Sequence, residues 1–323
     1  MIQTIIPQSR AADRISSQQF LPNVFILGAA KSATTTLAGL LGNVAETCLS
    51  AEKEPWFFEC EFERGLEYCR RQYFSHWQGE RVIFEARHRN LYLPWVPARI
   101  HQVNPNAKLI VVVRNPIDRA YSHWWYWCNH GRERDSFSVA IRKDYERICA
   151  GKVMQTEEER RQYYAAMEVS RRINSDGYGI YRTYLDSGYY LEQMQRYLEL
   201  FPRENMHVIL FDDVIRNQQQ TLSELLDFIG VPPETVAVAA NTHGEKKEPL
   251  TSSWIRALSN RQTTRRLLPY VPQAARQMLR IVREKTASWP EMDSDTRSWL
   301  REHYRPHVDA LQKFVGRDLS HWQ

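Results

Sequence analysis

The stretch Val24-Phe25-Ile26-Leu27-Gly28-Ala29-Ala30-Lys31-Ser32-Ala33-Thr34-Thr35-Thr36-Leu37 decides the fold of this chain. Four apolar residues run into a glycine, which is typical of a buried strand that ends in a tight turn. Small and hydroxylated residues follow, and Leu37, Leu40 and Leu41 then recur at helical spacing. A strand, a small-residue loop and a helix N-terminus together aim backbone N–H groups and the helix dipole at a phosphate.

The lysine of this loop is not where a Walker A motif places it. That motif would require a lysine at Thr34, whereas the chain has its lysine at Lys31. The pattern Gly-x-x-Lys-Ser-x-Thr-Thr after a strand instead resembles the 5′-phosphosulfate loop of the sulfotransferases, which use 3′-phosphoadenosine 5′-phosphosulfate (PAPS). A plain turn with a solvated lysine is the alternative. The family usually has glycine at the position of Ala33, where a methyl group narrows the approach of the backbone to a phosphate.

The resemblance gives this loop two roles. It implies that Lys31 stabilises the departing phosphate during catalysis. It also implies that the loop binds PAPS through six consecutive residues, which are Ala30, Lys31, Ser32, Ala33, Thr34 and Thr35.

A second apolar run, residues 109–113, ends in Arg114 and is followed by Asn115-Pro116. Such a run is typical of a strand buried on both faces of a parallel sheet. P-loop kinases and GTPases commonly use an aspartate here to hold magnesium, whereas a cation suits an anionic ligand that needs no metal. Arg114 and Ser122, which lies in the following helix, can meet at one phosphate. The run Arg-Asn-Pro-x-x-Arg-x-x-Ser also resembles the 3′-phosphate motif of the sulfotransferases, which implies that both residues bind PAPS.

Two side chains are candidates for the catalytic base. Glu54 lies in a Lys-Glu-Pro segment followed by the aromatic residues 56–58, which we expect to desolvate its carboxylate and raise its pKa. This segment resembles the catalytic stretch of the heparan-sulfate-type sulfotransferases, which implies that Glu54 is the base; a surface turn anchored by aromatic residues is the alternative. His88 follows the strand predicted over residues 81–86, where the cytosolic sulfotransferases place a histidine base. We predict Glu54 as the base and His88 as its rival.

The acceptor site is predicted from the resemblance and from aromatic clusters. In the family, the loop after the strand over residues 81–86 faces the substrate. The helix after Arg114 carries a Trp-Trp-Tyr-Trp run that cannot all point into one core, so part of it is a candidate pocket lining, with core packing as the alternative. The predicted acceptor contacts are Trp56, Glu85, Arg87, His88, Trp124 and Trp127.

The second half of the chain carries weaker signals. Residues 131–176 are charged and favour helix, either as an insertion that lids the site or as a solvated helix. A helix over residues 187–198, a strand over 207–211 stopped by Asp212-Asp213, and a helix over 218–229 resemble the closing unit of bacterial sulfotransferases. Further PAPS contacts are assigned, by position in the family, to Tyr189, Lys246 and Lys247.

Composition bounds the class of protein. The 323 residues are 43% hydrophobic, enough for a sizeable core, and a net charge of +5 argues against a dedicated nucleic-acid binder. The chain has no apolar run near the roughly 18 residues of a spanning helix, and residues 1–20 lack the apolar region of a signal peptide. The five cysteines show no metal spacing. We therefore expect a cytoplasmic enzyme without a metal or a membrane partner. The sequence does not determine its oligomeric state.

Together these observations predict a single α/β sulfotransferase domain over residues 22–323, preceded by an N-terminal arm over residues 1–21. We expect a P-loop-like parallel sheet flanked by helices, with the ligand at the carboxyl ends of the strands. The implied reaction is transfer of a sulfuryl group from PAPS to a hydroxyl or an amine, with 3′,5′-ADP as product. The aromatic content favours a small-molecule acceptor, such as a secondary metabolite or a carrier-bound acyl chain. A glycan sulfotransferase, a P-loop nucleotide kinase and a non-catalytic PAPS-binding protein are the alternatives.

Overall fold

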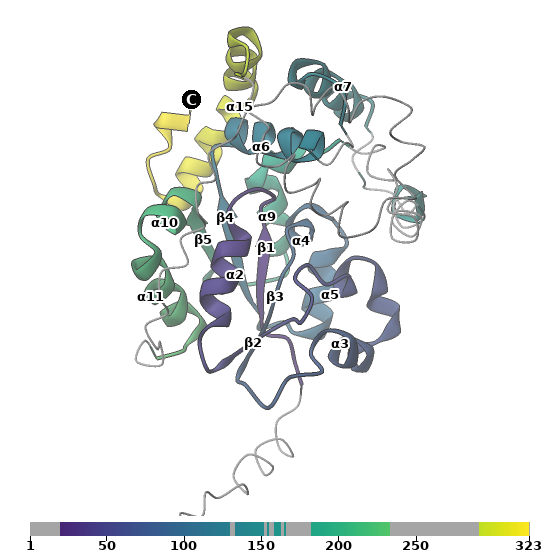
Figure 1. The fold of residues 1–323 in the computed structure, drawn as a ribbon, viewed down its shortest axis with the longest axis vertical. Helices are drawn as coiled ribbons and strands as arrows, with labels where there is room; N and C mark the ends of the chain where they lie inside the picture. Colours follow the sequence, from purple (N-terminus) through teal and green to yellow (C-terminus); the bar gives the residue numbers. More distant parts are fainter. Residues whose placement is uncertain are drawn as a thin grey trace, which may run out of the picture.

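The centre of the molecule is a five-stranded parallel sheet with the strand order β2-β3-β1-β4-β5 (Figure 1). The computed structural model describes residues 20–129, 133–151, 154, 158–162, 165, 182–232 and 291–322. The strands are β1 (Val24–Gly28), β2 (Thr47–Leu49), β3 (Val82–Ala86), β4 (Lys108–Val113) and β5 (Met206–Leu210). The predicted α/β class, with a parallel sheet flanked by helices, is confirmed.

The core forms two layers because successive side chains of a strand point to opposite faces of the sheet. Val24 and Ile26 of β1 pack on one face, beneath α2 (Thr34–Gly42) and α11 (Gln218–Ile229). Phe25 packs on the other face, where α4 (Arg89–Tyr92), α5 (Val96–Val103) and α9 (Tyr190–Leu198) lie. Every residue of β1 is buried, as the apolar run predicts.

Three helices lie beyond the carboxyl ends of the central strands, at the top of Figure 1. They are α6 (Pro116–Asn129), α7 (Phe137–Cys149) and α15 (Ser294–Val315). Because α6 follows β4 after a short turn, its first two turns lie over the edge of the sheet at which the loop after β1 also ends. This edge is where a doubly wound fold binds its ligands.

Several predicted elements have different bounds in the structure. Asp212 and Asp213, predicted to stop β5 in a turn, lie in the first turn of α10 (Phe211–Arg216), where acidic residues stabilise a helix N-terminus. The helix α3 spans Leu66–Tyr73, and the strand β2 was not among the predicted elements. Lys246 and Lys247, predicted to contact PAPS, lie outside the described residues.

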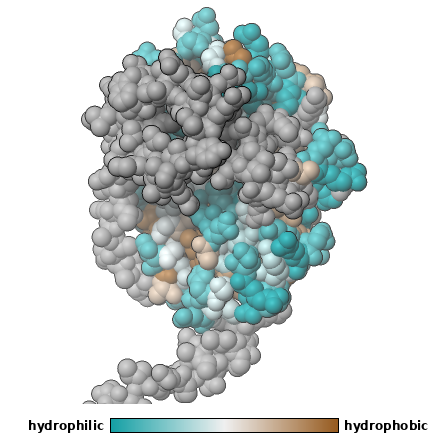
Figure 2. Space-filling model, turned by 45° about the vertical axis from the view of Figure 1, so that its right-hand side comes forward, coloured by the Kyte–Doolittle hydropathy of each residue, from teal (hydrophilic) through white to brown (hydrophobic). Residues whose placement is uncertain are grey.

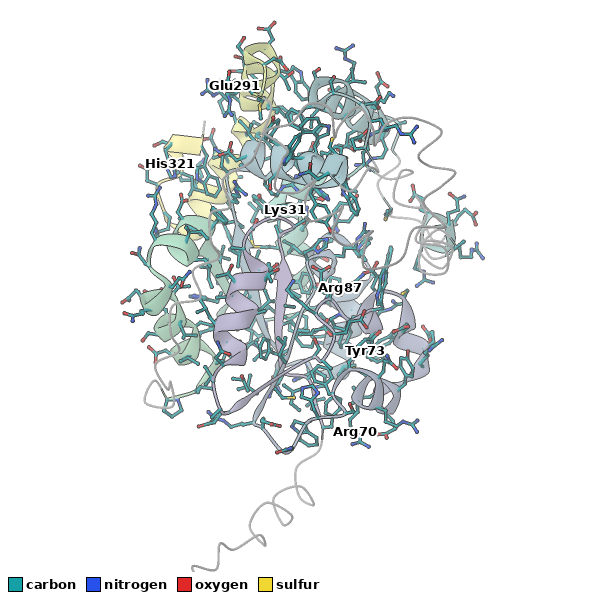
Figure 3. The ribbon with its side chains drawn as sticks, in the orientation of Figure 1. Lys31, Arg70, Tyr73, Arg87, Glu291 and His321 are labelled. Atoms are coloured by element: carbon teal, nitrogen blue, oxygen red, sulfur yellow. The ribbon has the colours of Figure 1, made fainter. Side chains whose placement is uncertain are left out.

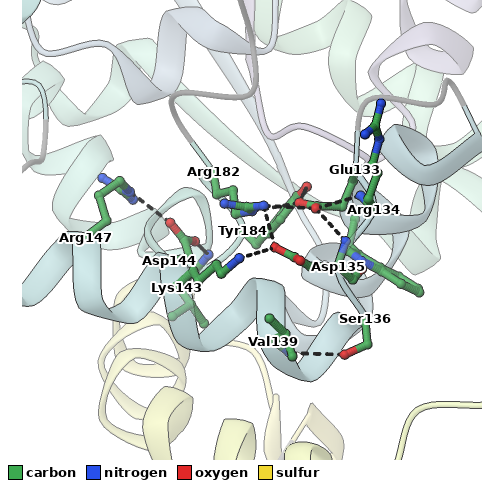
Figure 4. Close-up of polar contacts among 12 residues, drawn as sticks. Glu133, Arg134, Asp135, Ser136, Val139, Lys143, Asp144, Arg147, Arg182 and Tyr184 are labelled. Carbon is green, nitrogen blue, oxygen red and sulfur yellow. Dashed lines mark hydrogen bonds and ion pairs between the residues drawn. The ribbon is translucent and has the colours of Figure 1, made fainter. Parts of the chain in front are cut away.

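The helix predicted within residues 131–176 is present as α7, and ion pairs fix it to the chain near Arg182. Arg182 donates hydrogen bonds to Glu133 at 2.7 Å and to Asp135 at 2.8 Å (Figure 4). Asp144 is fully buried and accepts from Arg147 at 2.9 Å and from the backbone N–H of Leu185 at 2.7 Å. These contacts join α7 to the body of the domain. The lid role stays a prediction.

Glu85 of β3 is a buried acid and does not line the cleft described below, contrary to its predicted place in the acceptor site. Its position in the strand points it into the core, where it is 0% exposed. Oε1 accepts a hydrogen bond from Asn90 Nδ2 at 2.6 Å, and Oε2 has no partner among the described residues. Burial raises the pKa of Glu85 to about 8. At neutral pH the folded protein therefore keeps this carboxyl protonated.

The raised pKa of Glu85 predicts that stability falls as the pH rises. Between its ordinary pKa of 4.5 and about 8, Glu85 holds a proton in the folded protein but not in the unfolded chain. The stability that Glu85 contributes is fully present below pH 4.5 and is lost as the pH rises towards about 8. The free energy of unfolding falls over this range by at most about 1.4 kcal/mol per pH unit. Glu85→Gln should flatten the decline in urea unfolding free energy across that range, whereas the exposed Glu67→Gln should not. Parallel curves for wild type and Glu85→Gln would contradict this assignment.

Candidate active site

The loop between β1 and α2 presents an anion site. Ala33 caps α2 in the left-handed conformation, with φ 62°, and no side chain caps the helix. The first N–H groups of α2, from Thr34 and Thr35, therefore stay available for an anion. A residue other than glycine in this conformation costs about 1–2 kcal/mol, which explains why glycine suits this position.

Lys31 lies at the carboxyl edge of the sheet, next to α6 (Figure 3). Its ammonium is 4.5 Å from the centre of the Tyr126 ring. Burial and the neighbouring Arg114 lower the pKa of Lys31, although Glu54 acts in the opposite direction. Ser32 is fully buried, and its Oγ has no hydrogen-bond partner among the described residues.

Arg114 joins the two predicted phosphate motifs. Its Nη1 donates to the carbonyl oxygen of Lys31 at 3.1 Å, and its guanidinium lies 4.4 Å from the centre of the Phe211 ring. Within the described part of the chain, neither Lys31 nor Arg114 forms an ion pair with a carboxylate. Two cations therefore share one region without a directly paired carboxylate, which suits an anionic ligand.

These residues open onto a cleft with a volume of about 610 Å³. It brings together most of the predicted site. Around it lie the whole loop from Ala30 to Thr35, the strand-end arginine with its helix serine, both base candidates, and four of the six predicted acceptor contacts, His88 being counted in both sets. Its lining residues are Ala30, Lys31, Ser32, Ala33, Thr34, Thr35, Glu52, Lys53, Glu54, Trp56, Arg87, His88, Arg89, Arg114, Ser122, His123, Tyr126 and Trp127.

The two base candidates form one hydrogen-bonded pair. His88 Nδ1 lies 2.9 Å from Glu54 Oε1, and Lys53 Nζ lies 3.3 Å from the same oxygen. Because Nδ1 is engaged, Nε2 is the nitrogen of His88 that remains for a substrate. Glu54 and His88 are therefore partners, where the sequence presented them as rivals.

The predicted rise in the pKa of Glu54 is wrong. Burial alone raises this pKa, but His88, Lys53 and Arg87 outweigh it and hold the pKa well below its usual range. The aromatic residues do not form the expected wall around the carboxylate. Phe57 and Phe58 are buried in the core from the π-helix η1 (Phe57–Glu61), and Trp56 lies over the guanidinium of Arg87 at 4.1 Å.

Arg87 supports the pair of Glu54 and His88 through contacts in the protein interior. Its guanidinium is 2% exposed, forms an ion pair with the buried Glu59, and donates from Nη1 to the carbonyl oxygen of Glu54 at 2.6 Å. Arg87 therefore holds the Glu54 backbone while it is itself fixed by the ion pair with Glu59. The sequence analysis did not identify Glu59, because this contact joins segments that are distant in sequence.

One face of α6 lines the cleft with Ser122, His123, Tyr126 and Trp127. Trp124, a predicted acceptor contact, points to the opposite side, because two residues along a helix is more than half a turn. It packs in the core and donates from Nε1 to the carbonyl oxygen of Asp135 at 3.0 Å. His123 and Tyr126 were not predicted, although helical periodicity relates Tyr126 to Ser122 and His123 to Trp127, each pair being four residues apart.

Tyr189, a predicted PAPS contact, does not line the cleft either. Its hydroxyl lies 2.7 Å from His303 Nε2, and its ring stacks on His307 with the ring centres 4.1 Å apart. Both histidines belong to α15, so Tyr189 attaches the start of α9 to that helix. The two lysines predicted to close over PAPS are outside the described residues.

A parallel sheet with an uncapped helix N-terminus, two cations and a proton acceptor at its carboxyl edge suits the transfer of a group from an anionic donor. Residues 21–311 match the family model described as "Sulfotransferase domain", so the chain belongs to the sulfotransferase-domain family. The family predicted from the two phosphate motifs is thereby confirmed.

The relatives agree with this family. A crystal structure of a sulfotransferase from Alicyclobacillus acidocaldarius is similar with a TM-score of 0.63 and 25% identity, covering 94% of this chain and 99% of that one. The chain is 22% identical to the membrane-associated sulfotransferase kil1 of Dictyostelium discoideum, over 65% of this chain and 56% of that protein. It is 24% identical to the bifunctional heparan sulfate N-deacetylase/N-sulfotransferase 1 of Xenopus laevis, over 93% of this chain and 31% of that protein. The chain thus spans a third to about half of these two curated relatives.

The described residues include no helix that is both long enough and apolar enough to cross a membrane. In the same part of the chain, no group of three or more His, Cys, Asp or Glu side chains is arranged to hold a metal ion.

Proposed function

We propose that this protein transfers a sulfuryl group from PAPS to a hydroxyl of a small-molecule acceptor and releases 3′,5′-ADP. One observation carries the proposal. The loop with Lys31, the pair of Arg114 and Ser122, and the pair of Glu54 and His88 all line one cleft, although they come from separate segments of the chain.

The residues of the cleft suit PAPS. The N–H groups at the start of α2 and the unpartnered Ser32 Oγ offer donors to the 5′-phosphosulfate. Arg114 and Ser122 offer a guanidinium and a hydroxyl to the 3′-phosphate. Because Arg114 and Lys31 already lie together without a carboxylate partner in the described chain, a bound polyanion would neutralise both.

The chemistry divides between the cofactor and the side chains. PAPS, when bound, supplies the activated sulfuryl group. His88 Nε2 takes the proton of the acceptor hydroxyl as that oxygen attacks sulfur. Glu54 accepts the hydrogen bond from His88 Nδ1, fixes the orientation of the ring, and stabilises the imidazolium that forms. Lys31 and the neighbouring N–H groups stabilise the negative charge that develops on the departing phosphate oxygen.

The size and lining of the cleft favour a small acceptor. Its volume of about 610 Å³ must hold both the nucleotide and the acceptor, whereas pockets for a single small ligand are typically about 300–1,000 Å³. Trp56 and Trp127 offer apolar rings beside the base. A glycan acceptor is the alternative, because one similar protein is described as a heparan sulfate sulfotransferase.

Incubation with ³⁵S-labelled PAPS tests this proposal. Pools of phenols, aliphatic alcohols and heparan-type glycan are offered separately, each with EDTA present, and labelled products are separated by chromatography. We expect label on a small hydroxyl compound, and none when Lys31→Ala replaces the wild type. Label on glycan alone would contradict the acceptor class, and no label on any pool would contradict the activity.

We further propose that the protein works in the reducing cytoplasm. All five cysteines are free thiols, and burial raises the pKa of Cys48 to about 12. A buried thiol of this kind is inert. Free thiols are common in proteins of a reducing compartment, where disulfides are rare.

A further inference from the structure

A small cavity, which we call the inner chamber, lies beside the cleft. Its lining residues are Ala29, Ala30, His88, Arg89, Tyr92, His123, Thr183, Ser187 and Gln193, and four of these also line the cleft: Ala30, His88, Arg89 and His123. Its volume of about 10 Å³ is enough for one water molecule or one hydroxyl group. Since His88 is shared, a group in the chamber lies next to the proposed proton acceptor.

His123 lines both the chamber and the cleft, and its surroundings are unusual. Its side chain is 8% exposed, and Nδ1 is buried without a hydrogen-bond partner among the described residues. The ring is held edge-on to Tyr184, with ring centres 5.3 Å apart, and near Trp127 at 6.1 Å. Nδ1 is therefore the nitrogen of this fixed ring that a hydroxyl in the chamber would partner.

The chamber suits a neutral polar group. Burial, Arg119 and His88 keep the pKa of His123 well below its usual range, so the imidazole is uncharged and offers one donor and one acceptor. Two other side chains that line the chamber already have hydrogen-bond partners. Tyr92 donates to Asp186 Oδ2 at 2.8 Å, and Gln193 donates to the Asp186 carbonyl oxygen at 2.6 Å. Nearby Arg89 disfavours a cation, and the volume excludes a carboxylate or a phosphate.

We propose that the inner chamber is a second acceptor subsite, which takes a neutral hydroxyl adjacent to the one that is sulfated. His123 is its binding residue, and the acceptor class is a vicinal diol. This rests on the proposed function, because the reacting hydroxyl must lie at His88. A hydroxyl one carbon away can then enter the chamber, whose volume of about 10 Å³ is enough for one such group.

Calorimetry with two probes tests the subsite. Phenol and catechol, which differ by one adjacent hydroxyl, are titrated into the protein saturated with 3′,5′-ADP. We expect catechol to bind at least about tenfold more tightly, since one hydroxyl gains a partner in a buried site. His123→Phe should reduce the difference to about twofold or less, and His123→Gln should restore part of it. His207→Phe, the same change at a ring that stacks on Phe228, should leave it intact.

The outcomes of this titration distinguish failure of the subsite from failure of the proposed function. Equal affinities in the wild type, or a preference that survives His123→Phe, overturn the subsite. If His123→Phe does not fold, Thr183→Val removes a chamber hydroxyl at constant shape and must weaken catechol binding but not phenol binding. Failure of the wild type to bind 3′,5′-ADP contradicts the proposed function itself, whereas nucleotide binding without a catechol preference contradicts the subsite alone.

Discussion

His88→Asn should reduce turnover by about 100-fold or more while leaving 3′,5′-ADP affinity within about twofold. The substitution removes the nitrogen that faces the cleft, and a positioned proton acceptor contributes about this much to a rate. Glu54→Gln should reduce turnover by a smaller factor, because it removes the charge that orients His88 but not the accepting nitrogen. Single-turnover kinetics with labelled PAPS separates these effects from nucleotide binding.

The double variant is the sharpest control for this pair. If the two side chains act as a unit, Glu54→Gln combined with His88→Asn should be no slower than His88→Asn alone. His101→Asn on α5, outside the cleft, should have wild-type kinetics. The reverse ranking, an inactive Glu54→Gln beside an active His88→Asn, would make Glu54 the base, as the sequence analysis predicted.

Lys31→Ala should have the second large effect, a fall in the rate of the chemical step by about 100-fold or more. The ammonium lies within the anion-binding loop and makes no ion pair in the described structure, so its charge is available for the departing phosphate. Binding of 3′,5′-ADP should weaken less than the rate falls, because the loop N–H groups remain. Single-turnover kinetics gives the rate of the chemical step, and calorimetry on the same preparation gives the affinity for 3′,5′-ADP.

Lys143→Ala is the matched control for that substitution. Lys143 pairs with Asp135 at 2.8 Å on α7 and does not line the cleft. It should change neither the rate nor the affinity. A Lys31→Ala variant whose rate and nucleotide affinity fall by equal factors would show that Lys31 contributes to ground-state binding and not to the transition state.

The fold could be predicted because its decisive signals are local. The apolar run of β1 with its loop, and the run of β4 ending in Arg114, each specify a buried strand and its exit within a dozen residues. The strand β2 was missed because Thr47–Leu49 is too short for its pattern to stand out. Asp212 and Asp213 were misassigned because acidic residues occur both in turns and at helix N-termini.

The placement of the two phosphate motifs around one cleft could be predicted for the same reason, but the pairing of the two base candidates could not. Glu54 and His88 are distant in sequence, and nothing in either segment indicates that they share a hydrogen bond. The pKa of Glu54 depends on that contact and on Lys53 and Arg87. The neighbouring aromatic residues suggested that desolvation raises the pKa of Glu54. In the folded protein positive side chains surround the carboxylate, and their charge lowers the pKa by more than burial raises it.

The proposed function requires that this cleft recognises a nucleotide with a 3′-phosphate. Calorimetric titration of the wild type and of Arg114→Ala with 3′,5′-ADP and with AMP tests it most directly. A lost charge-assisted contact costs about 2 kcal/mol or more, so the wild type should bind 3′,5′-ADP at least about 30-fold more tightly than AMP. Arg114→Ala should remove most of this preference by weakening 3′,5′-ADP alone. Equal affinities of the wild type for the two nucleotides would contradict the claim, as would an Arg114→Ala variant that weakens both alike.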